Sequence, residues 1–293
     1  MLRCRETDNL AGLKQQTARL ESGQVIMDET TEPNYQLLRR IGGIAIGCAT
    51  QALFLFTVWH LFWFLKDGCP ASSIRFAAWD LFLAVQYVVP HSVLLLPAVK
   101  KRLLPYITSY FYGSFYCMAT CVGLLTAIFL WRGSSSVLWD LQGSAKLAVQ
   151  VGFGLSWVAL FYSLSLTGLG YQTGLTEWVA WLRRQPLERR TFRPRGAYLL
   201  LRHPVYLSFL GLIWFTPRMS LDHALLTGIW TTYILVGSVL KDQRLAYYLG
   251  QEYRAYAQRV EGYPLVGVGP LARWPEEPAA QAEAPCPTSQ RAA

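Results

Sequence analysis

The chain has 293 residues, of which 53% are hydrophobic, 14% aromatic and only 15% charged. This composition excludes an ordinary soluble domain, and several apolar runs reach the roughly 20 residues that a bilayer-spanning helix needs. The formal charge of +9 comes from basic residues that cluster beside those runs, which favours contact with membrane lipid over nucleic-acid binding.

Four long apolar runs are expected to be spans, at residues 41–65, 76–99, 110–131 and 147–169. The residues before them, 1–40, are mixed polar, and they predict either a short surface helix over Leu10–Leu20 or disorder. The segment from 132 to 146, which links the third and fourth spans, holds Gly, a run of Ser and Trp139, an aromatic residue typical of a membrane–water interface.

The second span carries an unusual number of polar residues, including Gln86 and His91. Polar groups in hydrocarbon are costly unless they face a bundle interior or a cavity, so an ionisable residue there is a functional candidate. A buried histidine bonded to a backbone carbonyl is the alternative interpretation of His91. We favour a functional role.

A helical hairpin is expected after the fourth span. Its short first arm covers 205–215, and its longer second arm runs from Ser220, a plausible N-cap, to about Leu240. An amphipathic tail follows, and residues 265–293 are rich in Pro, Ala and Glu, which predicts disorder. The sequence therefore predicts an all-α integral membrane protein with five to six transmembrane helices, a C-terminal helical hairpin and an amphipathic cytoplasmic tail. Its expected divisions are 1–40, the membrane domain 41–264 and 265–293.

Basic residues are unevenly distributed between the loops. Arg39-Arg40, Lys100–Arg102 and the Arg-rich loop Arg183–Arg202 would share one side of the membrane with both termini. Because positive loops stay in the cytoplasm, this side is predicted to be cytoplasmic. The site described next would then face the cytoplasm too.

The six cysteines form no Cys-x-x-Cys pair and have no histidine at zinc-ligand spacing. We therefore predict neither a disulfide framework nor a metal site.

The stretch Gly196–Tyr206 marks the point where the basic loop becomes an apolar helix. Pro204 suits the first helical turn because its missing N–H would be unpaired there anyway. The free N–H groups that follow, the helix dipole and Arg202 converge on one point. The stretch predicts an anion site at the membrane boundary. Lipid phosphate is the alternative ligand for Arg202, and helix capping the alternative role for His203.

Three features in order carry a resemblance to a known family. Arg202-His203-Pro204-x-Tyr206 follows Gly-x-Tyr, the hairpin comes next, and Leu249-Gly250-x-x-Tyr253-x-x-Tyr256 closes the pattern, with Val260 after it. This resembles the signature of the isoprenylcysteine carboxyl methyltransferase superfamily. The upstream stretch Asp80–Lys101 is similar to the nurim branch, which includes the bacterial methanethiol S-methyltransferases. The resemblance covers about Trp79–Tyr263.

The resemblance implies S-adenosylmethionine as methyl donor and no metal. Arg202 and the N–H groups after Pro204 suit the donor carboxylate, and Asp242 suits the ribose hydroxyls. Tyr198 and Tyr206 suit the adenine, and Tyr253 or Tyr256 suits the sulfonium. The alternative role for Tyr253 and Tyr256 is to pack the amphipathic tail on the membrane surface. The expected donor-binding residues are Tyr198, Arg202, His203, Pro204, Tyr206, Asp242, Tyr253 and Tyr256.

The nurim-like upstream stretch favours a small thiol as acceptor, with methanethiol converted to dimethyl sulfide. The thiolate is the reactive form, and His91 or His203 would take the thiol proton as catalytic residues. The alternatives are an isoprenylcysteine carboxyl methyltransferase and a non-catalytic nurim-like envelope protein. Two departures from the pattern favour the last: Ser208 stands for Gly, and Lys241-Asp242 stands for Glu-Glu.

Overall fold

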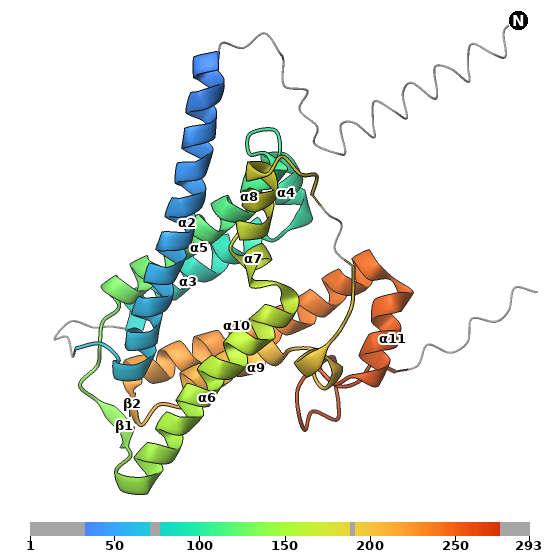
Figure 1. The fold of residues 1–293 in the computed structure, drawn as a ribbon. Coiled ribbons are helices and arrows are strands. Elements are labelled where there is room, and N and C mark those ends of the chain that lie inside the picture. Colours follow the sequence, from blue (N-terminus) through green and yellow to red (C-terminus); the bar gives the residue numbers. More distant parts are fainter. Residues whose placement is uncertain (1–32, 71–76, 188–190, 276–293) are drawn as a thin grey trace, which may run out of the picture. The chain divides into compact units, whose positions relative to one another are not determined.

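The computed structural model describes residues 33–70, 77–187 and 191–275. The expected surface helix at Leu10–Leu20 and the tail beyond Pro275 lie outside these residues. The helices are α2 (Pro33–Asp67), α3 (Ala77–Leu94), α4 (Pro97–Leu103), α5 (Ser109–Leu130), α6 (Gly143–Thr167), α7 (Leu169–Gln172), α8 (Leu175–Leu182), the 3₁₀ turn η1 (Gly196–Leu199), α9 (Pro204–Trp214), α10 (Leu221–Leu249) and α11 (Gln251–Arg259), as Figure 1 shows.

Five of these helices are long and apolar enough to cross a membrane: α2, α3, α5, α6 and α10. The first arm of the hairpin, α9, is apolar but has only 11 residues. This confirms the predicted class, a mostly helical multi-pass membrane protein with five to six apolar helices.

Three expected boundaries are wrong. The first span was expected to begin at residue 41, but α2 begins at Pro33. The second span was expected to run to residue 99, but α3 ends at Leu94 and α4 begins at Pro97, since proline cannot donate a hydrogen bond inside a helix. The second arm of the hairpin was expected to end near Leu240, but α10 continues to Leu249. Its polar last turns stay helical because they pack against α11 and the residues that follow it.

A short antiparallel ribbon was not predicted. Strand β1 (Val137–Asp140) pairs with β2 (Arg218–Ser220), with Val137 opposite Ser220 and Asp140 opposite Arg218. Each strand is too short to show an alternating pattern.

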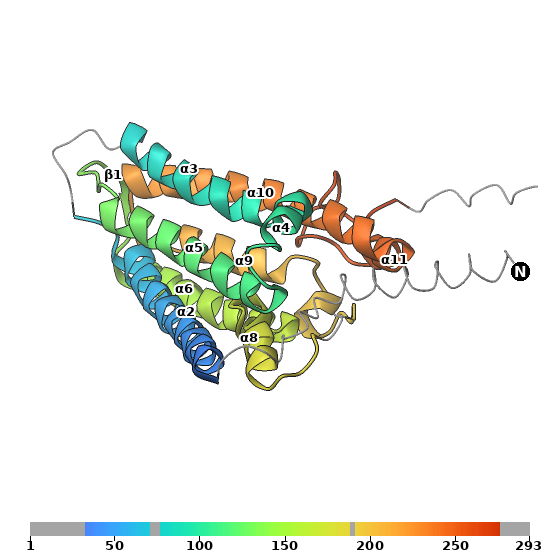
Figure 2. The same cartoon turned by 90° about the horizontal axis from the view of Figure 1, so that it is seen from above.

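The described residues form two compact units. The first contains the chain up to Asp140 together with 167–190 and 218–226. In it, α5 lies between α2 and α3 (Figure 2) and also contacts α8. Two glycines of α2 allow tryptophans of α8 to pack closely: Trp181 packs on Gly43 and Trp178 packs on Gly47. The Trp178 indole also donates a 2.9 Å hydrogen bond to the carbonyl of Gly43.

The second unit contains 141–166, 191–217 and the chain from Thr227 onward. Helices α6 and α9 approach closely at small residues, because a Cβ added to Gly211 would lie 2.2 Å from the Ser156 hydroxyl. Small residues of this kind allow tight helix packing in lipid. The start of α9 and the end of α10 are thereby fixed in one unit, and they carry the candidate site.

Candidate functional site

The residues just before α9 pair with the chain that follows α11. Leu201 forms a parallel bridge with Glu261, and the Arg202 N–H donates to the Glu261 carbonyl at 2.8 Å. We call residues 260–275 the C-terminal segment. Its own loop is closed by the N–H of Gly262, which donates to the carbonyl of Leu271 at 2.8 Å. The motif at the start of α9 is therefore held against the C-terminal segment.

Arg202 is buried, and all of its N–H groups are used by the protein. Nε and Nη2 lie 3.0 and 2.9 Å from Asp242 Oδ2. The remaining donors reach four backbone carbonyls at 2.8–3.2 Å, those of Ala257, Val260, Pro270 and Ala272. A guanidinium has five donors, so binding a ligand carboxylate at Arg202 would require exchange of one of these contacts.

Asp242 is also bound by protein groups. Oδ2 receives the two Arg202 contacts, and Oδ1 accepts a short hydrogen bond from the Tyr253 hydroxyl. His203 Nε2 lies 3.1 Å from the same Oδ1, without the alignment of a hydrogen bond. Three of the roughly four lone-pair sites of the carboxylate are therefore used by Arg202 and Tyr253, and His203 Nε2 lies beside the fourth.

His203 lies beside this carboxylate with its side chain buried. Its ring stacks on that of Tyr206, with centroids 5.6 Å apart and planes at 14°, and it lies 5.5 Å from the ring of Tyr263. Nδ1 is buried and has no hydrogen-bond partner among the described residues. Burial lowers the pKa of His203, and Asp242 opposes that shift in part. The imidazole is therefore neutral at neutral pH, and Nδ1 is its free nitrogen.

Tyr253 and Tyr256 of α11 are both buried. The Tyr256 hydroxyl donates to the backbone carbonyl of Tyr198 at 2.6 Å, and both rings pack edge-on against Phe192. Burial raises the pKa of both hydroxyls, and the Asp242 charge raises that of Tyr253 further. The two tyrosines thus connect α11 to Asp242 and to η1.

The two departures from the family pattern have different surroundings. The Ser208 hydroxyl donates to the carbonyl of Pro204 at 2.9 Å, so its polar group is satisfied within α9. The Lys241 ammonium lies 5.0 Å from the ring centre of Tyr206 and 6.0 Å from that of Tyr198.

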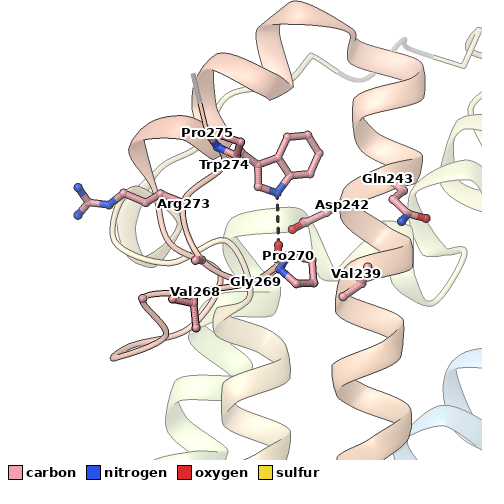
Figure 3. A pocket seen from close by; sticks show the side chains of 11 residues that line it. Val239, Asp242, Gln243, Val268, Gly269, Pro270, Arg273, Trp274 and Pro275 are labelled. Carbon is pink, nitrogen blue, oxygen red and sulfur yellow. Dashed lines mark hydrogen bonds between the residues drawn. The ribbon is translucent and has the colours of Figure 1, made fainter. Parts of the chain in front are cut away.

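A pocket of about 550 Å³ opens between α10 and the C-terminal segment (Figure 3). Asp242, Val239 and Gln243 of α10 line one side, and residues 267–270 and 272–275 line the other. The Trp274 indole covers part of it and donates to the Pro270 carbonyl at 3.3 Å. The sequence reasoning missed Trp274 and its neighbours because composition assigned residues after 264 to a disordered tail. A tryptophan in an otherwise Pro/Gly-rich stretch was the available signal.

The structure brings together all the predicted donor-binding residues in the second unit, but His91 lies in the first. There the Tyr116 hydroxyl lies 3.0 and 3.1 Å from the two ring nitrogens of His91, and the Tyr87 ring lies 5.6 Å away. The catalytic role of His91 stays a prediction. No cluster of three metal-ligating side chains occurs among the described residues.

Comparison with known proteins relates the chain to one group. It is 30% identical to the methanethiol S-methyltransferase of Pseudomonas deceptionensis over 66% of this chain and 75% of that protein. It is 27% identical to the enzyme of the same name from Mycobacterium tuberculosis over 76% and 96%, and 28% identical to nurim of Rattus norvegicus over 65% and 74%. No protein-family model and no solved structure matches the chain. The chain belongs to the family that contains the methanethiol S-methyltransferases and nurim.

Proposed function

We propose that the chain is a membrane-embedded, S-adenosylmethionine-dependent S-methyltransferase that acts on a small thiol and converts methanethiol to dimethyl sulfide. The observation that carries the proposal is the buried, unpartnered Nδ1 of His203. A buried polar atom without a partner is rare in proteins and calls for an explanation, and a ligand or substrate proton at Nδ1 supplies one.

The surroundings of His203 suit its use as a base. The Asp242 carboxylate beside Nε2 favours the tautomer with the proton on that nitrogen. Nδ1 then keeps its lone pair and accepts the proton of the thiol, leaving the thiolate as nucleophile. Arg202 fixes Asp242 from the other side, so it acts in this proposal as a positioning residue.

The residues near His203 also suit the methyl donor. When bound, S-adenosylmethionine supplies an electrophilic methyl group on a cationic sulfur. Tyr198 and Tyr206 present aromatic rings to the same place as the Lys241 ammonium, and rings of this kind can stack on an adenine. Tyr253, Tyr256 and Pro204 hold the frame around them. The loop charges support a site that faces the cytoplasm.

A non-catalytic, nurim-like membrane protein is the second candidate. It is favoured by the use of every Arg202 donor by protein groups and by the hydrogen bonds that Arg202 and Tyr253 donate to Asp242, because folding alone then accounts for both residues.

Two measurements on purified protein in detergent distinguish the candidates. Calorimetry should detect binding of S-adenosylmethionine, and headspace chromatography should detect dimethyl sulfide when methanethiol is added. Arg259→Gln, at an exposed side chain of α11 outside the pocket lining, should behave as the parent, whereas His203→Gln should lose turnover. If the protein methylates a prenylcysteine analogue and not methanethiol, the acceptor is a prenylcysteine carboxylate instead of a small thiol. The absence of donor binding would favour the non-catalytic protein.

A further inference from the structure

The site contains a cation whose hydrogen-bonding capacity is unused. Lys241 follows Val239 and Leu240 on α10 and is half-buried. Among the described residues its ammonium has ring contacts with Tyr206 and Tyr198 but no hydrogen bond or ion pair. Its neighbour Asp242 accepts hydrogen bonds from Arg202 and Tyr253, and His203 Nε2 lies 3.1 Å from its Oδ1. Lys241 therefore keeps all three of its N–H donors for another partner.

From this arrangement we propose that Lys241 binds a ligand carboxylate, that of the methyl donor; the inference rests on the proposed function. A cation over an aromatic ring gains about 0.5–2 kcal/mol, which does not replace the water that a half-buried ammonium loses. A carboxylate supplies both the charge and the hydrogen-bond acceptors, and charge-assisted contacts of this kind are strong.

The charges of the possible ligand groups determine which one Lys241 attracts. A sulfonium carries the same sign of charge and is repelled, and a neutral thiol offers only a weak acceptor. The carboxylate is the one negatively charged group of the donor, so an ammonium attracts it more strongly than the neutral acceptors of the adenine and ribose. Lys241 also replaces an acidic residue of the family pattern, so this contact would be particular to chains with a lysine here.

Arg202 is the residue that the motif suggests for the same task, and its geometry argues against it. Its N–H groups already reach Asp242 and four carbonyls, so no vacant donor faces a ligand. His203 lies between Arg202 in the sequence motif and Lys241 on α10, because its ring stacks on that of Tyr206. The Lys241 ammonium contacts the same Tyr206 ring. A carboxylate on Lys241 would therefore lie close to the free Nδ1 of His203.

The test compares binding of S-adenosylmethionine and its decarboxylated analogue to the purified full chain in detergent. The parent should prefer the form with the carboxylate by about ten- to a hundred-fold, as expected for a charged hydrogen bond. Lys241→Gln should lose that preference, and Lys241→Arg should restore part of it. Arg244→Gln removes the same charge one turn along α10 and should keep the preference. Circular dichroism and thermal unfolding check that each variant is folded.

Three outcomes overturn the inference. An undiminished preference in folded Lys241→Gln means that another group binds the carboxylate. An equal loss in Arg244→Gln means that Lys241 acts only through net charge. If Lys241→Gln instead weakens competition by mercaptoacetate, a thiol with a carboxylate, while the donor preference persists, the carboxylate belongs to the acceptor. Absence of binding of either nucleoside by the parent would overturn the proposed function together with the inference, and so is distinct from failure at Lys241 alone.

Discussion

Arg202 and Asp242 form an ion pair that is buried on both sides, with Nη2 2.9 Å from Oδ2 and side chains 0% and 1% exposed. Two charges removed from water stabilise a fold only when their geometry is good and their other hydrogen bonds are satisfied. Both conditions hold, since Arg202 also reaches four carbonyls and Asp242 also accepts from Tyr253. The pair therefore joins α9, α10, α11 and the C-terminal segment.

Removal of the Arg202 guanidinium should destabilise the second unit strongly. In Arg202→Ala the Asp242 charge stays buried without its main partner, a change that typically costs about 3–5 kcal/mol. The control is Arg273→Ala, because Arg273 pairs with Glu261 at 3.2 Å but is 62% exposed, and exposed pairs contribute about 0–1 kcal/mol. Thermal unfolding in detergent should show a large shift for the first variant and a small one for the second. Equal shifts would contradict the structural role given to Arg202.

The hydroxyls of Tyr253 and Tyr256 on α11 should contribute differently to the free energy of unfolding. Tyr253→Phe removes a hydrogen bond to a carboxylate, worth about 1.5–3 kcal/mol, whereas Tyr256→Phe removes one to a neutral carbonyl, worth about 0.5–1.5 kcal/mol. Both variants keep the ring contacts with Phe192. Denaturant unfolding should therefore rank Tyr253→Phe as the less stable. The reverse order would mean that the hydrogen bond from Tyr253 to Asp242 contributes less to stability than the one from Tyr256 to the Tyr198 carbonyl.

Gly262 should not tolerate even one added methyl group. A Cβ there would lie 2.5 Å from the Leu271 carbonyl oxygen and 3.3 Å from the His203 ring, so Gly262→Ala should cost about 1–3 kcal/mol through displaced backbone. Gly267 lies in the same segment, and a Cβ there meets nothing within 4 Å, so Gly267→Ala is the matched control. Limited proteolysis of residues 260–275 should accelerate only in Gly262→Ala. Similar digestion of both variants would show that the segment is not closed on His203.

Stability should fall with acid because of His203. Burial lowers its pKa in the folded chain, while in the unfolded chain it has the ordinary value of about 6.5. Below that value the unfolded state binds the extra proton, so the contribution of His203 is complete above about pH 6.5 and is lost as the pH falls toward the folded pKa. Asp242, Arg202 and Lys241 influence this titration. The measurement is the unfolding temperature between pH 8 and pH 5, and His203→Gln should flatten the curve. A slope unchanged in His203→Gln would assign the acid sensitivity to another group.

The orientation in the membrane can be tested at two exposed positions. Gln185 follows α8 in the Arg-rich loop, and Ser135 lies before β1. With the native cysteines replaced, an impermeant thiol reagent outside intact cells should label Ser135→Cys and should leave Gln185→Cys unlabelled until the cells are opened. The opposite pattern would invert the membrane orientation and move the candidate site out of the cytoplasm.

The sequence predicted the helices better than the contacts between them. Apolar length is a local property, so all five long helices were anticipated, and only their ends differed, at the start of α2, where Pro97 intervened and where α11 supported α10. The residues of the motif lie together in the second unit, whereas His91 lies in the first, and the roles predicted for all of them stay predictions. Their partners could not be read from the sequence. The acceptors of the Arg202 guanidinium lie 40 to 70 positions further along the chain, and nothing in the residues themselves marks a backbone carbonyl as a partner.

The carbonyl partners of Arg202 also fix an order of events during synthesis. Arg202 leaves the ribosome 55 residues ahead of Ala257 and 70 ahead of Ala272, so water or lipid phosphate must solvate its guanidinium until α10 has been inserted and the chain after it has been made. The contacts of Arg202 are thus complete only after Ala272 has been made. A fusion partner or purification tag placed before Pro275 would interrupt that final step, whereas one placed after it leaves the contacts of Arg202 available.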